Sequence, residues 1–161
     1  MNPEHRKIIE HLYLEMYDML ISYARCSFKE EALAEEAVQE TFRIACQKPD
    51  QVCESPNPQG WIVNTLRNTV RDIRREQTAA VALVERYASS QPTKITATED
   101  GLRLELQYGD MAQTEEFRLL VEWAVEGRSH AQIAAARGIS VDACKKRVQR
   151  AKEILRKKIK K

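Results

Sequence analysis

The segment SHAQIAAARGISVDACKKRVQRAKEILRKKIKK, residues 129–161, decides the fold class of this chain. Its pattern predicts a helix, a tight turn at Gly138 and a second helix, because glycine permits the backbone conformation that such a turn requires. Ser140 has a side chain preferred at a helix N-cap. Apolar residues then recur at three- and four-residue spacing, as on one face of a helix. That face consists of Val141, Cys144, Val148, Ala151 and Leu155.

The opposite face of the second helix is basic. It carries Lys145, Lys146, Arg147, Gln149 and Arg150. A helix-turn-helix with a basic second helix is suited to the DNA major groove. An ordinary helical hairpin with a solvated charged face is the alternative, but turn, cap, apolar stripe and charge agree with one another here.

Charge is distributed unevenly along the chain. The whole sequence has 26 Lys plus Arg and 24 Asp plus Glu, but the segment from Arg128 to the end has 12 basic and two acidic residues. The remainder therefore carries 14 basic and 22 acidic residues. This asymmetry predicts salt-dependent binding of phosphates by the C-terminal segment. The acidic remainder is suited to a basic protein surface.

Composition restricts the class of protein. A chain of 161 residues with 43% hydrophobic residues can form one domain or two small ones, and it is not wholly disordered. It has no apolar run near the ~18 residues of a membrane span, and the N-terminus lacks a signal-peptide core. The four cysteines form no CxxC pair and no metal-ligand spacing. We therefore expect reduced thiols, a cytoplasmic location, no metal site and no cofactor.

Helical periodicity covers most of the chain, and no alternating strand pattern occurs. The expected helices are residues 3–26, 29–47, 59–76 with an extension towards 87, and 114–126, with a turn or two near 102–106. The expected inward face of the first helix is Ile8, Ile9, Leu12, Met16, Met19, Leu20 and Tyr23. Residues 48–58, with three prolines, are expected to be a loop without regular helix. The prediction is an all-α fold of two small helical domains, residues 1–88 and 114–161, joined by a flexible linker over 89–113.

Two further motifs accompany the helix-turn-helix, namely AEEAVQETFRIACQK at residues 34–48 and PQGWIVNTLRNTVRDIRR at residues 58–75. In this order, the three motifs resemble the extracytoplasmic-function group of bacterial RNA polymerase sigma factors. The resemblance implies a protein without chemistry of its own, which binds core RNA polymerase, places it on promoter DNA and helps open that DNA. It also implies an anti-sigma factor as a partner, often a membrane protein.

The resemblance assigns a role to each motif. The first helix motif docks on the coiled-coil clamp of the largest polymerase subunit, through Glu35, Glu36, Gln39 and Glu40 in this chain. Glu36 stands where the family usually has Asp, and a merely solvated acidic face is the alternative. The second motif, with the loop before it, holds the unwound minus-ten element. Its candidate residues are Trp61, Asn64, Arg67, Asn68, Arg71, Arg74 and Arg75.

Side-chain chemistry agrees with these roles. Asn and Arg can hydrogen-bond an extruded base and the backbone, whereas Trp61 is as well suited to anchoring the core as to stacking on a base. Asp72 is expected to be an internal salt-bridge partner. In the helix-turn-helix, Asp142, Ala143, Lys145 and Lys146 are expected at base edges of the minus-thirty-five element, with Arg147 and Arg150 on phosphates. Ala143, Cys144 and Lys146 depart from the family pattern, which bears on promoter sequence and not on the fold.

Two other classes of protein are alternatives, namely an enzyme and a stand-alone regulator. The three histidines lie in unrelated contexts, and no HExxH, GxSxG or P-loop is present, so no catalytic residue and no small-molecule substrate are expected. A stand-alone helix-turn-helix regulator that never contacts polymerase is the second alternative. The motifs at residues 34–48 and 61–75 distinguish a sigma factor from such a regulator.

Overall fold

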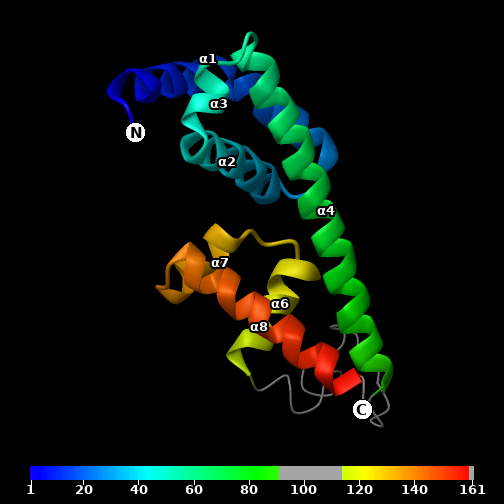
Figure 1. The fold of residues 1–161 in the computed structure, drawn as a ribbon. Coiled ribbons are helices and arrows are strands. Elements are labelled where there is room, and N and C mark those ends of the chain that lie inside the picture. Colours follow the sequence, from blue (N-terminus) through cyan, green and yellow to red (C-terminus); the bar gives the residue numbers. More distant parts are fainter. Residues whose placement is uncertain (91–113, 160–161) are drawn as a thin grey trace. The chain divides into compact units, whose positions relative to one another are not determined.

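The computed structural model describes residues 1–90 and 114–159. Its helices are α1 (Pro3–Ser27), α2 (Glu31–Gln47), α3 (Pro49–Cys53), α4 (Pro58–Ser90), α6 (Glu115–Ala124), α7 (His130–Arg137) and α8 (Val141–Ile159) (Figure 1). The described residues contain no strand, which confirms the all-α prediction. None of the described helices is long and apolar enough to cross a membrane. The helical turn expected near residues 102–106 lies outside the described residues.

The chain divides into two compact units, Met1–Arg75 and Glu76–Lys161. The division falls within α4, so the last part of that helix belongs to the second unit. The sequence-based division at residue 88 instead kept almost the whole of this helix in the first domain. Each unit has its own core.

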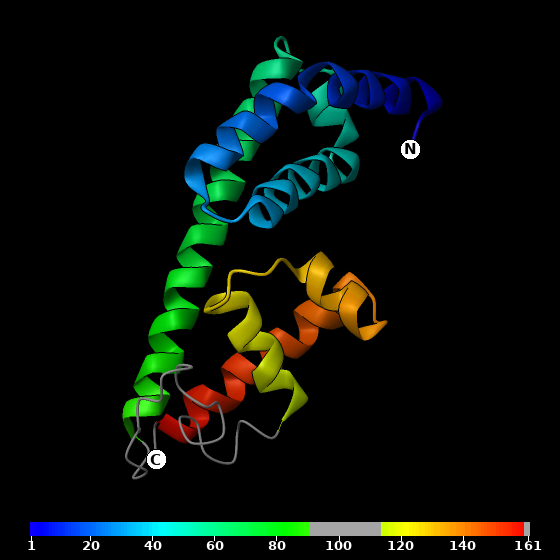
Figure 2. The same cartoon turned by 180° about the vertical axis from the view of Figure 1, so that it is seen from behind.

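The first unit packs α1, α2, α3 and the start of α4 around one core. Pro3 opens α1, where a missing backbone N–H costs nothing, and the Asn2 side chain accepts a hydrogen bond from the Glu4 backbone N–H at 2.8 Å. Figures 1 and 2 show α1 and the start of α4 side by side. Ile62 and Leu66 of α4 are fully buried in this core. Burial of such a side chain contributes about 1.5–3 kcal/mol.

Two expectations about the first unit were wrong. Ile8, Met19 and Tyr23 are exposed, and Ile21 and Ala24 are buried instead. With about 100° between successive helical residues, those three lie along one edge of the buried stripe, where the neighbouring helices do not cover them.

The second error concerns residues 48–58, which contain the short helix α3. Pro49 stands at the first helical position, where proline is tolerated, and Val52 is fully buried. The prolines of this segment therefore limit the length of the helix and do not prevent it.

The second unit packs α6, α7, α8 and the end of α4 around another core. Phe117 and Trp123 of α6 are its largest fully buried side chains. The end of α4 contributes Ala80, Leu83, Val84, Tyr87 and Ala88 to this core. The Tyr87 ring lies 6.1 Å from that of Phe117, and the Gln77 side chain donates a hydrogen bond to the Trp123 carbonyl oxygen at 3.1 Å. These contacts explain why the end of α4 belongs to the second unit.

Candidate functional site

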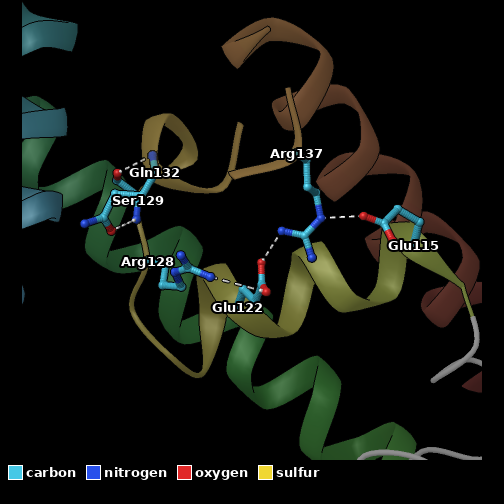
Figure 3. Close-up of polar contacts among 6 residues, drawn as sticks. All are labelled: Glu115, Glu122, Arg128, Ser129, Gln132 and Arg137. Carbon is cyan, nitrogen blue, oxygen red and sulfur yellow. Dashed lines mark hydrogen bonds and ion pairs between the residues drawn. The ribbon is translucent and has the colours of Figure 1, made fainter. Parts of the chain in front are cut away.

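The turn between α7 and α8 has the geometry that its sequence predicts. Ser129 and Gln132 form a capping box at the start of α7, with the Gln132 backbone N–H donating to Ser129 Oγ at 3.1 Å (Figure 3). Gly138 ends α7 with φ at 65°, in the left-handed region that glycine favours. Ser140 Oγ then accepts a hydrogen bond from the Ala143 backbone N–H at 3.0 Å. Both helices of the motif therefore begin at capped residues.

An ion-pair network holds α7 against α6. Arg137, in the last turn of α7, donates from Nη1 to Glu122 Oε2 at 2.7 Å and from Nε to Glu115 (Figure 3). Arg128 also approaches Glu122, at 3.4 Å. The hydrogen bond that Arg137 donates to Glu122 is the main reason that the pKa of Arg137 is raised above its ordinary value. This network fixes the helix that precedes the turn, and helical spacing does not reveal it, because its members are 15 and 22 residues apart.

The apolar face of α8 is buried as the spacing predicts, with two differences. Cys144, Val148, Ala151 and Leu155 are buried, but Val141 in the first turn is 39% exposed. Lys152 is only 9% exposed, and its Nζ lies 4.9 Å from the centroid of the Trp123 ring. Burial lowers the pKa of Lys152. This lysine therefore belongs to the core and is not available to bind phosphate.

The candidate DNA-binding residues of α8 differ in exposure. Asp142, Lys146 and Arg150 are exposed and recur every four residues, so they form one stripe along the helix. Ala143, Lys145 and Arg147 are half-buried. The exposed stripe is the part of the helix that a DNA groove could approach most closely.

The candidate polymerase-binding residues lie along α2. Glu35 and Gln39 are exposed, whereas Glu36 and Glu40 are half-buried. Glu40 also accepts two hydrogen bonds from Arg43, one turn later on the same helix. Glu35 and Gln39 are thus the most solvent-exposed members of this set.

The candidate residues of α4 surround a hollow of about 560 Å³ between the start of α4 and the end of α1. Asn64, Arg67, Asn68, Arg71 and Arg74 line it. We call this hollow the α1–α4 groove. Asn68 Oδ1 accepts a hydrogen bond from Arg71, which leaves the Asn68 amide N–H groups as potential donors.

Two of the predicted minus-ten residues lie away from the groove. Trp61 is half-buried and packs against the core of the first unit. Arg75 is exposed and pairs with Asp72 at 2.9 Å, which agrees with the internal salt bridge expected of Asp72. The groove instead includes Tyr23 and Ser27 of α1. Sequence reasoning missed Tyr23 because its spacing on α1 assigned it to the core.

No group of three or more His, Cys, Asp or Glu suited to a metal ion occurs in residues 1–90 and 114–159. No disulfide joins Cys26, Cys46, Cys53 or Cys144. Cys46 is exposed and Cys144 is buried.

Comparison with known families matches both units. Residues 12–80 match the family described as sigma-70 region 2, and residues 115–155 match the family described as sigma-70, region 4. The first match contains the acidic face of α2 and the α1–α4 groove, and the second contains α6, α7 and most of α8. No curated protein matches the chain.

Proposed function

We propose that the chain is a sigma factor of the extracytoplasmic-function group. The matches to regions 2 and 4 support a sigma-70 family factor that binds RNA polymerase and promoter DNA. It directs core polymerase to specific promoters and helps open the DNA near the start site. Because its partner transcribes the chromosome, the factor works in the cytoplasm. An anti-sigma factor is a further proposed partner, and it rests on the group resemblance alone.

The combination of the two regions in one chain carries this proposal. A stand-alone regulator needs only the capped helix-turn-helix of α7 and α8. Such a regulator does not require a separate unit with an acidic helix and a basic groove. Residues 12–80 contain both features. That unit favours a sigma factor over the alternative.

The polymerase contact is assigned to Glu35, Glu36, Gln39 and Glu40 of α2. The double variant changes the two most exposed positions of this set. Glu35→Lys reverses a charge and places like charge against a basic partner, which typically costs several kcal/mol, and Gln39→Ala removes the neighbouring amide. We expect this double variant to lose binding to core polymerase in a pull-down while its helicity and its affinity for a promoter fragment stay unchanged. Glu126→Lys, the same reversal at an exposed residue of the second unit, is the control. Retention of wild-type core binding by the double variant would disprove the assignment.

Promoter opening is assigned to the loop before α4 and to the polar face of that helix. The holoenzyme with Asn68→Ala should bind duplex promoter nearly as well as wild type, because phosphate contacts dominate that affinity. It should produce far fewer permanganate-reactive thymines around the start site, since a contact to an extruded base is missing. A pre-melted template should restore transcription only in part. Full opening of duplex DNA by this variant would show that Asn68 is only structural.

Promoter selection is assigned to α8, with Asp142, Ala143, Lys145 and Lys146 at base edges and Arg147 and Arg150 on phosphates. The exposure of the stripe that contains Lys146 and Arg150 supports roles for these two residues. The half-buried Lys145 and Arg147 can reach DNA only with the ends of their long side chains.

A further inference from the structure

The α1–α4 groove contains an aromatic ring as well as basic and amide side chains. Tyr23 of α1 is 41% exposed and lines the hollow with Asn64, Asn68 and three arginines of α4. All of the charged residues that line it are cationic, namely Arg67, Arg71 and Arg74. The groove therefore attracts anions and also offers a flat apolar face.

Tyr23 differs from the other tyrosines of α1 in the contacts of its ring. The other two tyrosines early in this helix are engaged, since the Tyr13 ring lies 5.4 Å from that of Tyr17 and 5.0 Å from that of Phe42. No aromatic ring in the part of the chain that the structure describes packs on Tyr23 in this way. Its ring is left on the wall of the hollow, at the edge of the buried stripe of α1.

This combination of groups is suited to one kind of ligand. Duplex DNA presents phosphates and groove edges, and arginine and asparagine bind these without an aromatic ring. An unpaired base exposes its flat face as well, and aromatic side chains beside a basic track are typical of single-strand binding sites. An acidic peptide would satisfy the arginines but would not require the ring.

We propose that Tyr23 is the stacking platform for an unpaired base of the promoter strand, with the backbone of that strand held by Arg67, Arg71 and Arg74. Asn68 donates to the edge of the base or to the sugar beside it, because its carbonyl oxygen is already occupied by Arg71. This inference rests on the proposed role in promoter opening and adds a residue of α1 to it. It also means that capture of the strand does not depend on hydrogen bonds alone.

The test compares three variants in the holoenzyme. Tyr23→Ala removes the ring, Tyr23→Phe keeps it, and Met19→Ala shortens a side chain that is 55% exposed one turn earlier and does not line the groove. Fluorescence anisotropy gives the affinity for a single-stranded non-template oligonucleotide and for the same promoter as duplex. Tyr23→Ala should weaken single-strand binding by roughly 5- to 150-fold, the range for loss of one stacked base, and leave duplex binding unchanged. Tyr23→Phe and Met19→Ala should behave as wild type.

Salt dependence distinguishes stacking from charge and from a structural role. Arg67→Ala should reduce the slope of log affinity against log salt by about 0.7, the value for one phosphate contact to a single strand. Tyr23→Ala should lower affinity at every salt concentration and leave the slope unchanged. Quenching of 2-aminopurine in the oligonucleotide should be lost in Tyr23→Ala and kept in Tyr23→Phe.

Several results would overturn the proposal. They are an affinity of Tyr23→Ala within twofold of wild type, an equal loss in Tyr23→Phe, and an equal loss of single-strand and duplex binding. Tight binding of polyglutamate that survives loss of the ring, without binding of the oligonucleotide, would identify a protein-binding surface instead. The same titrations on the free full-length chain separate this inference from its premise. If the wild type fails to bind core polymerase, the proposed function fails, while the free-chain titration still decides whether Tyr23 stacks on a base.

Discussion

Arg137→Ala should destabilise the second unit by about 2 kcal/mol. The side chains of Arg137 and Glu122 are 19% and 20% exposed, and their hydrogen bond is 2.7 Å long. A hydrogen bond to a charged group contributes about 1.5–3 kcal/mol, and partial exposure places this one towards the lower end. The pair with Glu115, which is 47% exposed, adds a few tenths of a kcal/mol, as for a surface pair. Arg128 remains near Glu122, so the carboxylate is not left without a cation.

The assay is thermal unfolding of the full chain, followed by circular dichroism. For a domain of about 60–100 residues, a loss of 2 kcal/mol lowers the midpoint by roughly 8–16 °C. Arg150→Ala removes the same side chain from an exposed position of α8 and should change the midpoint by only about 2 °C. The Arg137→Ala variant should also lose affinity for duplex promoter DNA at a lower temperature than wild type. The reason is that α7 and the turn are no longer bonded to α6 through Arg137. If Arg137→Ala unfolds at the same temperature as Arg150→Ala, the network does not hold the motif together.

Changes at four positions test the turn, the start of α4 and α8. In Gly138→Ala the added Cβ meets open space, but the backbone is in the left-handed region, so the free energy of unfolding should fall by about 1 kcal/mol. Gly138→Asn should lower it by less. Denaturant unfolding measures both. Gly60→Ala should displace the Asn57 side chain, whose Nδ2 lies 2.5 Å from the added Cβ, and so weaken an N-terminal cap worth about 1 kcal/mol in the first unit. Lys146→Ala should change which base is preferred at one position by about 1–3 kcal/mol in a promoter-library selection. Arg150→Ala should weaken all promoters alike and reduce the salt slope by about one, and equal, uniform losses in the two variants would contradict their separate roles.

Local patterns in the sequence were sufficient for the helices and for the helix-turn-helix. The apolar spacing of Cys144, Val148 and Leu155, the glycine at 138 and the cap at Ser140 are all local signals, and the structure confirms each of them. The same spacing failed at the edges of helices. Tyr23 lies on the apolar side of α1, but whether a residue at the edge of a stripe is covered depends on the neighbouring helix.

The candidate site was predictable only where it lies on one helix. Asn64, Arg67 and Asn68 share one face of α4, and helical spacing indicates this directly. The hollow between α4 and α1 depends on the packing of two helices whose facing residues are about 40 positions apart in sequence, which no local pattern encodes. Likewise, no local pattern in the sequence indicates that Lys152 of α8 lies beside the Trp123 ring.

The assignment of the end of α4 to the second core limits how this chain can exchange parts with its relatives. A crossover between residues 91 and 113 would separate Leu83, Val84 and Tyr87 from the residues that they pack against in the core, including Phe117. In the resulting hybrids, the apolar residues of the helix-turn-helix unit would lose the α4 side chains that cover them. The apolar residues at the end of α4 would be exposed as well. Recombination between residues 91 and 113 should therefore yield poorly folded hybrids. A break at residue 75, although it interrupts a helix, would keep each set of buried residues together.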